Sequence, residues 1–190
     1  MRCGRYAAID IGTVTCRMLV VDADESGLHE LTREYAITNL GEGVDATGEL
    51  KPEAIDRVVR AIDGFLAVRD SLSTPDHPVV RTVAVAGTAT TVVSIRERME
   101  TYDSSRVHKA LVSRQDLLEV YERLAALPLS ERMQVVGLDP KRAPVMVAGL
   151  LILLEVLDFT GIDAFTVSET DILHGITLAV SHEACEKSCL

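Results

Sequence analysis

The feature that most constrains the fold is the stretch AIDIGTVTC at residues 8–16. An apolar run ends there in Asp10, and the chain passes at once through Gly12 into hydroxyl-bearing residues. Because glycine has no Cβ, the backbone N–H groups of residues 12–15 can point closely at one place. Such a nest of amides binds an oxyanion. The alternative is an ordinary β-hairpin, in which the aspartate and the glycine serve only the geometry of the turn.

Side chains around this turn support an anion site. Thr13 and Thr15 supply hydroxyl donors, and Arg17 supplies positive charge if the strand turns it inward. The Asp10 carboxylate can hold a divalent cation, which would offset its repulsion of a phosphate. The predicted phosphate-binding residues of this first turn are Gly12, Thr13, Val14, Thr15 and Arg17, and the predicted metal ligand is Asp10.

The sequence around the turn predicts a meander of strands covered by a helix. Residues 5–11, 17–22 and 29–38 are rich in apolar and β-forming types, and glycine-bearing turns separate them. After a glycine-rich loop, Pro52 opens a segment whose apolar residues recur at helical spacing as far as Leu66. We therefore expect an amphipathic helix on one face of this sheet.

A second glycine turn follows the next predicted strand. Residues 71–78 predict a loop, and residues 79–86 predict a strand that leads directly into glycine and threonine. A helix begins after this turn, so its amides can meet an anion or a nucleotide at a helix N-terminus. The alternative is a simple capped helix with Thr88 as N-cap. The predicted phosphate-binding residues of this second turn are Gly87, Thr88, Ala89 and Thr90.

The remainder of the chain is predicted to be mostly helical. Ser113 and Ser130 are expected to cap helices, residues 143–161 to form a long apolar helix, and residues 164–167 the last strand, before a helix from about residue 171. Strands dominate the first half and helices the second. The predicted fold is therefore α/β with two unequal lobes, divided as residues 1–86 and 87–190.

Composition and charge exclude several classes of protein. The 190 residues are 47% hydrophobic, which indicates a globular protein. A formal charge of −10 without a basic run argues against nucleic acid and membrane as partners. No secretory pattern precedes the first strand, so we expect a cytoplasmic protein. The apolar block at residues 143–157 is shorter than the roughly 20 residues that cross a bilayer, and it is interpreted as a buried helix.

The four cysteines are scattered, without a CxxC pair, which predicts free thiols and no disulfide framework. His182, Cys185 and Cys189 have spacing that could hold a metal ion on a C-terminal helix. No fourth ligand is evident there, so the spacing is only a weak match to a metal site.

Five segments, taken in chain order, resemble the exopolyphosphatase and guanosine pentaphosphate phosphohydrolase family, within the actin, hexokinase and Hsp70 fold group. IDIGTVTCRMLVVD resembles the first phosphate motif of that family, and VAVAGTATTVVSI resembles the glycine motif of its second domain. The segments that follow the glycine motif in the family are similar to YDSSRVHKALVSRQDL, GLDPKRAPVMVAGLLIL and TVSETDILHGI. The resemblance implies ribonuclease-H-like lobes of the actin-like ATPase type.

The resemblance also implies an activity. In this family, water attacks the terminal phosphoryl group of polyphosphate or of guanosine pentaphosphate, while Mg²⁺ and backbone amides stabilise the developing charge. On this chain Asp10 would be the ligand of the metal or its water, residues 12–15 the phosphate nest, and residues 87–90 the opposing wall. The choice between the two substrates stays open. A sugar or acetate kinase of the same fold group is disfavoured, because RVHKALVS and DPKRAPVMVAG resemble the phosphatase branch.

The chain departs from the family pattern in its middle. A stretch about the size of a small domain is missing, including the second aspartate-led glycine turn and the segment that bears the family's catalytic glutamate. Val14 also stands where the family usually has a polar residue. The segment VVRTVAVA resembles both a first-lobe and a second-lobe strand, as a deletion between similar strands would produce. A naturally minimal relative is the alternative.

This gap predicts an incomplete first lobe and impaired hydrolysis. No catalytic base is identified in the chain. A sheet that lacks its later strands exposes unpaired edges, which favour a homodimer or aggregation. A non-catalytic remnant of the family that binds phosphate or oligomerises is therefore the alternative function.

Overall fold

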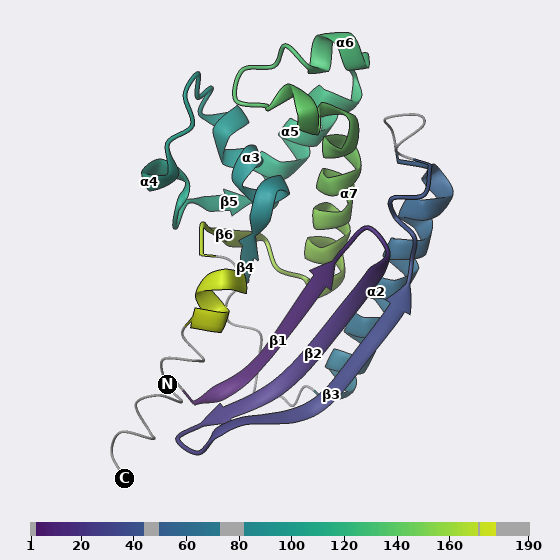
Figure 1. Cartoon of the computed structure of the whole chain (residues 1–190), viewed down its shortest axis with the longest axis vertical. Coiled ribbons are helices and arrows are strands. Elements are labelled where there is room, and N and C mark those ends of the chain that lie inside the picture. The colour runs from purple at the N-terminus through teal and green to yellow at the C-terminus, as the bar shows by residue number, and fades with distance from the viewer. Residues whose placement is uncertain (1–2, 44–49, 73–81, 171, 178–190) are drawn as a thin grey trace. The chain divides into compact units, whose positions relative to one another are not determined.

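The computed structural model describes residues 3–43, 50–72, 82–170 and 172–177 (Figure 1). Strands and helices are mixed, and the second half is rich in helices, as predicted. In chain order the elements are β1 (Gly4–Ile11), β2 (Thr15–Asp24), β3 (Gly27–Ile37), α2 (Pro52–Leu72), β4 (Val83–Val85), α3 (Ala86–Arg96), α4 (Ser104–Val107), β5 (Leu111–Ser113), α5 (Arg114–Ala125), α6 (Leu129–Arg132), the 3₁₀ helix η1 (Pro140–Arg142), α7 (Ala143–Thr160) and β6 (Ala164–Ser168).

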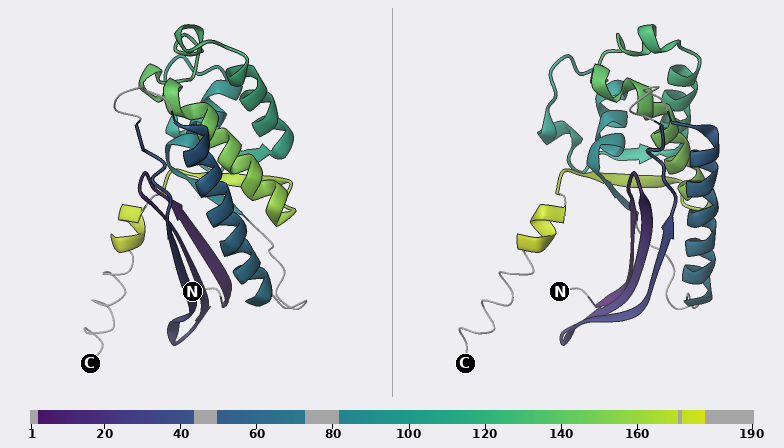
Figure 2. Two further views of the ribbon diagram at one scale, coloured as in Figure 1. Left: turned by 90° about the vertical axis from the view of Figure 1, so that its right-hand side faces the viewer. Right: turned by 45° about the vertical axis from the view of Figure 1, so that its right-hand side comes forward.

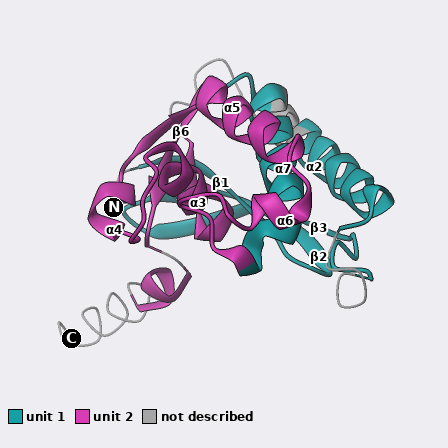
Figure 3. Ribbon diagram, turned by 90° about the horizontal axis from the view of Figure 1, so that it is seen from above, with its two compact units in different colours: residues 1–80, 141–163 teal, residues 81–140, 164–190 magenta. Residues whose placement is uncertain are grey.

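The chain divides into two compact units, coloured separately in Figure 3. Unit 1 comprises Met1–Val80 and Lys141–Asp163, and unit 2 comprises Arg81–Pro140 and Ala164–Leu190. These units follow packing and do not coincide with the predicted division into residues 1–86 and 87–190. The physical reason is α7, whose apolar side chains pack against α2 of unit 1 although it lies late in the chain. The two-lobe division stays a prediction.

The predicted meander is confirmed in unit 1. β1, β2 and β3 form a three-stranded antiparallel sheet with β2 in the centre, so β1 and β3 are its edge strands among the described residues. The turns fall where glycine was expected, between β1 and β2 and between β2 and β3. A bulge interrupts the pairing of β2 with β3 between Val20 and Val21.

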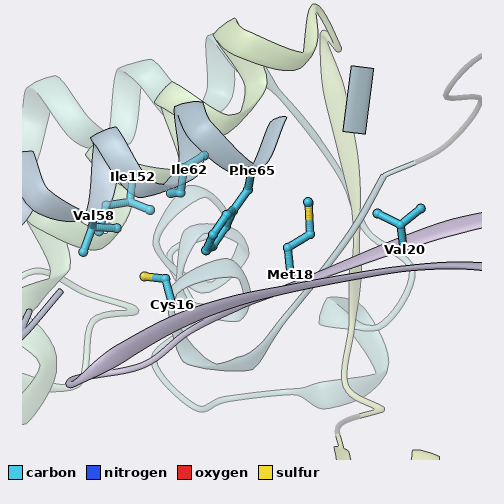
Figure 4. Packing of buried hydrophobic residues seen from close by; sticks show 7 residues of the cluster. All are labelled: Cys16, Met18, Val20, Val58, Ile62, Phe65 and Ile152. Carbon is cyan, nitrogen blue, oxygen red and sulfur yellow. The ribbon is translucent and has the colours of Figure 1, made fainter. Parts of the chain in front are cut away.

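One face of this sheet is covered by α2, as the helical spacing predicted. Figure 2 shows α2 running along the sheet in two views. Alternate residues of β2 pack against residues of α2 at helical spacing and against one residue of α7 (Figure 4). The buried members of this cluster are Cys16, Met18, Val20, Val58, Ile62, Phe65 and Ile152. The strand period of two and the helix period of 3.6 thus bring two apolar faces together.

Unit 2 is built on a second sheet of three short strands, in the order β4-β6-β5. β4 and β6 are parallel, and β5 is antiparallel to β6. α3 packs against α5 and this sheet, and its residues from Thr91 to Ile95 are all buried. The segment VVRTVAVA therefore contributes its described strand, β4, to the second sheet; residues 79–81 lie outside the described residues.

Several local predictions are confirmed. Ser113 caps α5 in a capping box, in which its hydroxyl accepts from the Asp116 N–H and Asp116 accepts from the Ser113 N–H. α7 begins with a proline in its first turn and ends at Gly161, whose φ of 64° lies in the left-handed region. Cys3 and Cys16 are free thiols. No helix among the described residues is long and apolar enough to cross a membrane.

Other local predictions are wrong. Ser130 does not cap a helix, because α6 begins one residue earlier, after Pro128, and is only four residues long. The residues 87–91 form no turn before a helix, because α3 already begins at Ala86. α2 continues to Leu72, two residues into the predicted loop 71–78. The metal spacing of His182, Cys185 and Cys189 lies outside the described residues.

The turn between β2 and β3 gives a testable pH effect. The pKa of Asp24 is lowered from 3.8 to about 2, mainly because the Ser26 hydroxyl donates to it, helped by the Ser26 N–H and the His29 ring. A lowered folded-state pKa stabilises the hairpin above the unfolded value, and this stabilisation is lost as the pH falls toward 2. NMR titration of the Asp24 carboxyl is expected to find this pKa. Ser26→Ala should raise it more than His29→Ala, and the opposite order would contradict the structure.

Candidate functional site

The first predicted phosphate turn lies between β1 and β2 in unit 1. The Gly12 N–H donates to the Thr15 carbonyl at 2.9 Å and closes the turn. A Cβ on Gly12 would lie 3.2 Å from that same carbonyl oxygen, a tight approach that favours glycine here. The Gly12 amide is therefore occupied by the hairpin. The backbone donors that remain for an anion at this turn are those of residues 13–15.

The loop after β3 packs against the turn through backbone hydrogen bonds. The Gly41 N–H donates to the Thr13 carbonyl at 2.8 Å. The Thr38 and Asn39 N–H groups donate to the Val14 carbonyl at 2.9 and 3.0 Å. Gly41 comes so close that a Cβ there would lie 3.2 Å from the Thr13 Cβ. Residues 38–41, called the supporting loop below, thus hold both carbonyls of the turn.

This arrangement orients the remaining amides. In a planar trans peptide, the N–H points opposite to the carbonyl of the preceding residue. The Thr13 and Val14 carbonyls point at the supporting loop, so the N–H groups of Val14 and Thr15 point away from it. The partly negative carbonyl oxygens are turned away from any anion that these amides meet. Two amides sharing one direction are the geometry that an anion nest requires.

Asp10 and Arg17 are directly opposite each other on β1 and β2. Both side chains are exposed. Arg17 alternates with the buried residues of β2, and Asp10 is its cross-strand partner, so both lie on the face of the sheet that α2 does not cover. Thr15 shares this face because it is two residues from Arg17 on the same strand. The first half of the predicted site is therefore brought together in unit 1: the turn, one carboxylate and one guanidinium.

Among the described residues, Asp10 is the one predicted to hold a cation. Mg²⁺ is usually held by one or two carboxylates together with substrate phosphates and water. A single exposed carboxylate beside a turn with outward amides fits that donor set. No group of three or more histidine, cysteine or acidic residues that could hold a metal by itself occurs among the described residues.

Beneath the turn lies a neutral buried pair. The Cys16 Sγ is 3.6 Å from the Thr38 Oγ1, and both side chains are buried. Burial raises the pKa of the Cys16 thiol, an effect that the Thr38 hydroxyl opposes and the negative charge of Asp10 supports. Cys16 therefore stays protonated at neutral pH and adds no negative charge below the amides of the turn.

The second predicted turn is the first turn of α3, in unit 2. The N-cap Val85 provides no side-chain hydrogen bond, so Thr88 is not the N-cap. The N–H groups of Ala86, Gly87 and Thr88 belong to the start of the helix and have no acceptor within it. Ala89 and Thr90 lie further along, where the amides bond within the helix. The Ala89 side chain is buried, and the Thr90 hydroxyl donates to the Gly87 carbonyl at 3.3 Å. Of the four predicted residues, Gly87 and Thr88 thus keep amides suited to an anion. An opposing wall formed by residues 87–90 stays a prediction.

The supporting loop was not predicted as part of the site. Thr38 was predicted as the end of a strand, and the other residues lie in the glycine-rich segment NLGEG, where the sequence indicates only a loop. Asn39 has a φ of 48°, a left-handed conformation that asparagine tolerates, and this turns the chain back toward the hairpin. The glycine at position 41 was the available indication, because a glycine outside a tight turn marks a close approach of two backbones.

Comparison with known proteins gives one family. The model of the Ppx/GppA phosphatase family matches residues 67–184, which is more than half of the chain. The first turn and Asp10 lie before this match, and the first turn of α3 lies within it.

Two curated relatives match about half of the chain. The bifunctional 3-dehydroquinate synthase/phosphatase of Fusobacterium nucleatum is 41% identical over 97 residues, which are 50% of this chain and 14% of that protein. Exopolyphosphatase 2 of Mycobacterium tuberculosis is 37% identical over 103 residues, which are 52% of this chain and 32% of that protein. The match therefore spans less than a third of the length of the exopolyphosphatase and a smaller share of the bifunctional protein.

Solved structures resemble the fold of the chain more widely. The crystal structure of the Aquifex aeolicus member of the Ppx/GppA family superposes with a TM-score of 0.54 and 15% sequence identity, covering 96% of this chain and 99% of that chain. At this identity the likeness concerns the fold alone. It supports the predicted α/β fold, including the N-terminal residues that precede the family match.

Proposed function

The chain belongs to the Ppx/GppA phosphatase family, and we propose that it binds the terminal phosphates of inorganic polyphosphate or guanosine pentaphosphate at the turn between β1 and β2. The observation that carries the proposal is the pair of hydrogen-bonded carbonyls at Thr13 and Val14. These bonds direct the next two amides away from the supporting loop, where they can receive a phosphate oxygen.

Each neighbouring group has a proposed role. The amides of residues 13–15 and the hydroxyls of Thr13 and Thr15 bind phosphate oxygens. Arg17 contributes positive charge against the net charge of −10. Asp10 would hold Mg²⁺, and that ion would supply charge neutralisation between the carboxylate and the phosphates when bound.

The proposed reaction is hydrolysis of the terminal phosphoanhydride bond. One relative is named an exopolyphosphatase, which supports this chemistry for the family. Positioning and electrostatic stabilisation account for most of the catalysis in such a reaction. The turn supplies both in part. We assign no general base to a described residue, so we expect binding to be better preserved than turnover.

A non-catalytic role is the second candidate function, and the free edges of the first sheet favour it. β1 and β3 each lack a second neighbour among the described residues. Tyr6, Tyr35 and Ile37 are exposed on these edge strands, with 48%, 73% and 65% of their surfaces accessible. A homodimer joined through this sheet would bury them. Sedimentation analysis with and without polyphosphate would distinguish a dimer from a monomer that only binds phosphate.

Calorimetric titration with long-chain polyphosphate tests the phosphate site. We expect the unchanged chain to bind it more tightly in the presence of Mg²⁺, because the cation offsets the repulsion between Asp10 and phosphate. Asp10→Asn should abolish this magnesium dependence and lower the affinity in magnesium about tenfold or more. Asp56→Asn, an exposed carboxylate on α2, is the matched control and should bind as the unchanged chain does. Equal magnesium dependence in both variants would contradict the role of Asp10.

A further inference from the structure

The supporting loop is itself held by one side chain of α2. The Arg57 Nε donates to the Thr38 carbonyl at 2.7 Å. The Arg57 Nη2 donates to the Asn39 carbonyl at 3.3 Å and to the Glu42 Oε2 at 2.9 Å. One guanidinium thus contacts two residues of the supporting loop and Glu42, the residue that follows the loop. We propose that Arg57 is a positioning residue for the phosphate turn, acting through the supporting loop; this inference rests on the proposed function of that turn.

The path from Arg57 to the turn is short and consists of direct hydrogen bonds. Thr38 receives Arg57 at its carbonyl and donates its N–H to the Val14 carbonyl. Asn39 does the same with its own carbonyl and N–H. Since these two donors orient the Val14 carbonyl, the Thr15 amide depends on where the supporting loop lies. A shift of the loop would therefore turn that amide.

The base of this path is buried. Thr38 is 1% exposed, and its hydroxyl contacts the buried Cys16 Sγ. Arg57 lies on α2 one residue before Val58, which is fully buried in the core of unit 1. The helix backbone that carries Arg57 is thus fixed by the core that fixes β2. We therefore expect Arg57 to fix the position of the supporting loop, and not the loop to fix the position of Arg57.

Charge also holds Arg57 in place. Glu42 is bridged between Arg57 and Lys51, whose Nζ lies 2.8 Å from the Glu42 Oε1. The Lys51 ammonium first, and the Arg57 guanidinium second, lower the pKa of Glu42, so this carboxylate is ionised at neutral pH. The planar fork of arginine spans two carbonyls and a carboxylate, whereas the single ammonium of a lysine cannot.

The experiment compares Arg57→Ala and Arg57→Lys with Arg60→Ala. Arg60 is an exposed arginine three residues further along α2 and serves as the matched control. Two quantities are measured for the whole chain: the hydrogen exchange rates of the Thr38, Asn39 and Gly41 amides without ligand, and the affinity for magnesium tripolyphosphate. Denaturant unfolding of each variant is measured alongside, so that a loss of affinity can be separated from a loss of fold.

Arg57→Ala is expected to speed exchange of the three amides about tenfold, the effect of losing one charge-assisted hydrogen bond. It should weaken tripolyphosphate binding about tenfold or more, while unfolding occurs at nearly the same denaturant concentration as in Arg60→Ala. Arg57→Lys should have exchange rates and a tripolyphosphate affinity between those of the unchanged chain and those of Arg57→Ala. This variant remains informative if the alanine variant fails to fold. Arg60→Ala should change neither quantity.

Two results would overturn the positioning role. One is exchange at the three amides that is as slow in Arg57→Ala as in Arg60→Ala. The other is faster exchange with unchanged tripolyphosphate affinity, which would make Arg57 a structural residue only. A failure of the unchanged chain to bind tripolyphosphate is a different result: it would overturn the proposed function, and the exchange rates would still decide whether Arg57 holds the loop.

Discussion

Replacing Gly137 with alanine is expected to destabilise unit 2 by about 3 kcal/mol or more, from backbone strain together with overpacking. Gly137 has a φ of 88° and lies in the turn Val135–Leu138, closed by a hydrogen bond from the Leu138 N–H to the Val135 carbonyl. A Cβ at Gly137 would lie 2.2 Å from the Ser94 carbonyl oxygen and 2.8 Å from the Ile95 nitrogen. Both atoms belong to the backbone of α3, which cannot move without disturbing its buried side chains.

The matched control is Gly161→Ala. Gly161 also has a positive φ, 64°, but a Cβ there would meet nothing within 4 Å. Its substitution is expected to cost about 1 kcal/mol, the strain of an alanine in the left-handed region. Denaturant unfolding followed by circular dichroism measures both variants. If the two alanine variants unfold at the same denaturant concentration, the turn at Gly137 does not pack against the backbone of α3 as described.

The meander could be predicted because its determinants are local. Apolar alternation defines the strands, and glycine at positions 12 and 27 defines the turns. The same holds for α5, where Ser113 and Asp116 have the spacing of a capping box, and for α7, which ends at Gly161. In each case the residues that specify the structure lie within one turn of the element that they begin or end.

The start of α3 was mispredicted because packing overrides local preference. Glycine and threonine are poor helix formers, so residues 87–91 indicated a turn. In the structure, α3 includes them because Ala89, Thr91 and Val92 are buried against the rest of unit 2. The three-residue strand β5 was missed for a related reason: within the described part of the chain it pairs with β6, which lies far along the sequence, and β5 has no local pattern of its own.

The roles of the predicted site residues stay a prediction, whereas the structure adds a loop that the sequence did not indicate as a support of the turn. The turn and Asp10 could be recognised from sequence because glycine and aspartate follow an apolar strand. The hydrogen bond that occupies the Gly12 amide could not be predicted, because its acceptor, the Thr15 carbonyl, is brought there by the closure of the hairpin. Nor could the contacts of the supporting loop with Thr13 and Val14, which join segments separated by the whole of β2 and β3. The sequence indicates such long-range backbone contacts only indirectly. Here the indication is the glycine at position 41, where the two backbones approach closely.

Hydrolysis of long-chain polyphosphate by this chain is expected to be slower than by a full-length relative by a factor of about 10² to 10⁴. That factor is the usual contribution of one general base, and the family resemblance predicts that the segment bearing the catalytic glutamate is missing from this chain. The loss of further phosphate contacts would reduce the rate again.

A phosphate-release assay with Mg²⁺ measures this rate, with exopolyphosphatase 2 of Mycobacterium tuberculosis as the reference. Asp10→Asn is the internal control, since a residual rate that is equal in both forms of the chain comes from a contaminating phosphatase. Turnover near that of the reference, abolished by Asp10→Asn, would contradict the predicted loss of the base. It would mean that some group in this chain, or in a second copy, takes the proton from water. Tight binding with turnover reduced as expected would instead support the proposal that this chain positions phosphate through its amides without an efficient general base.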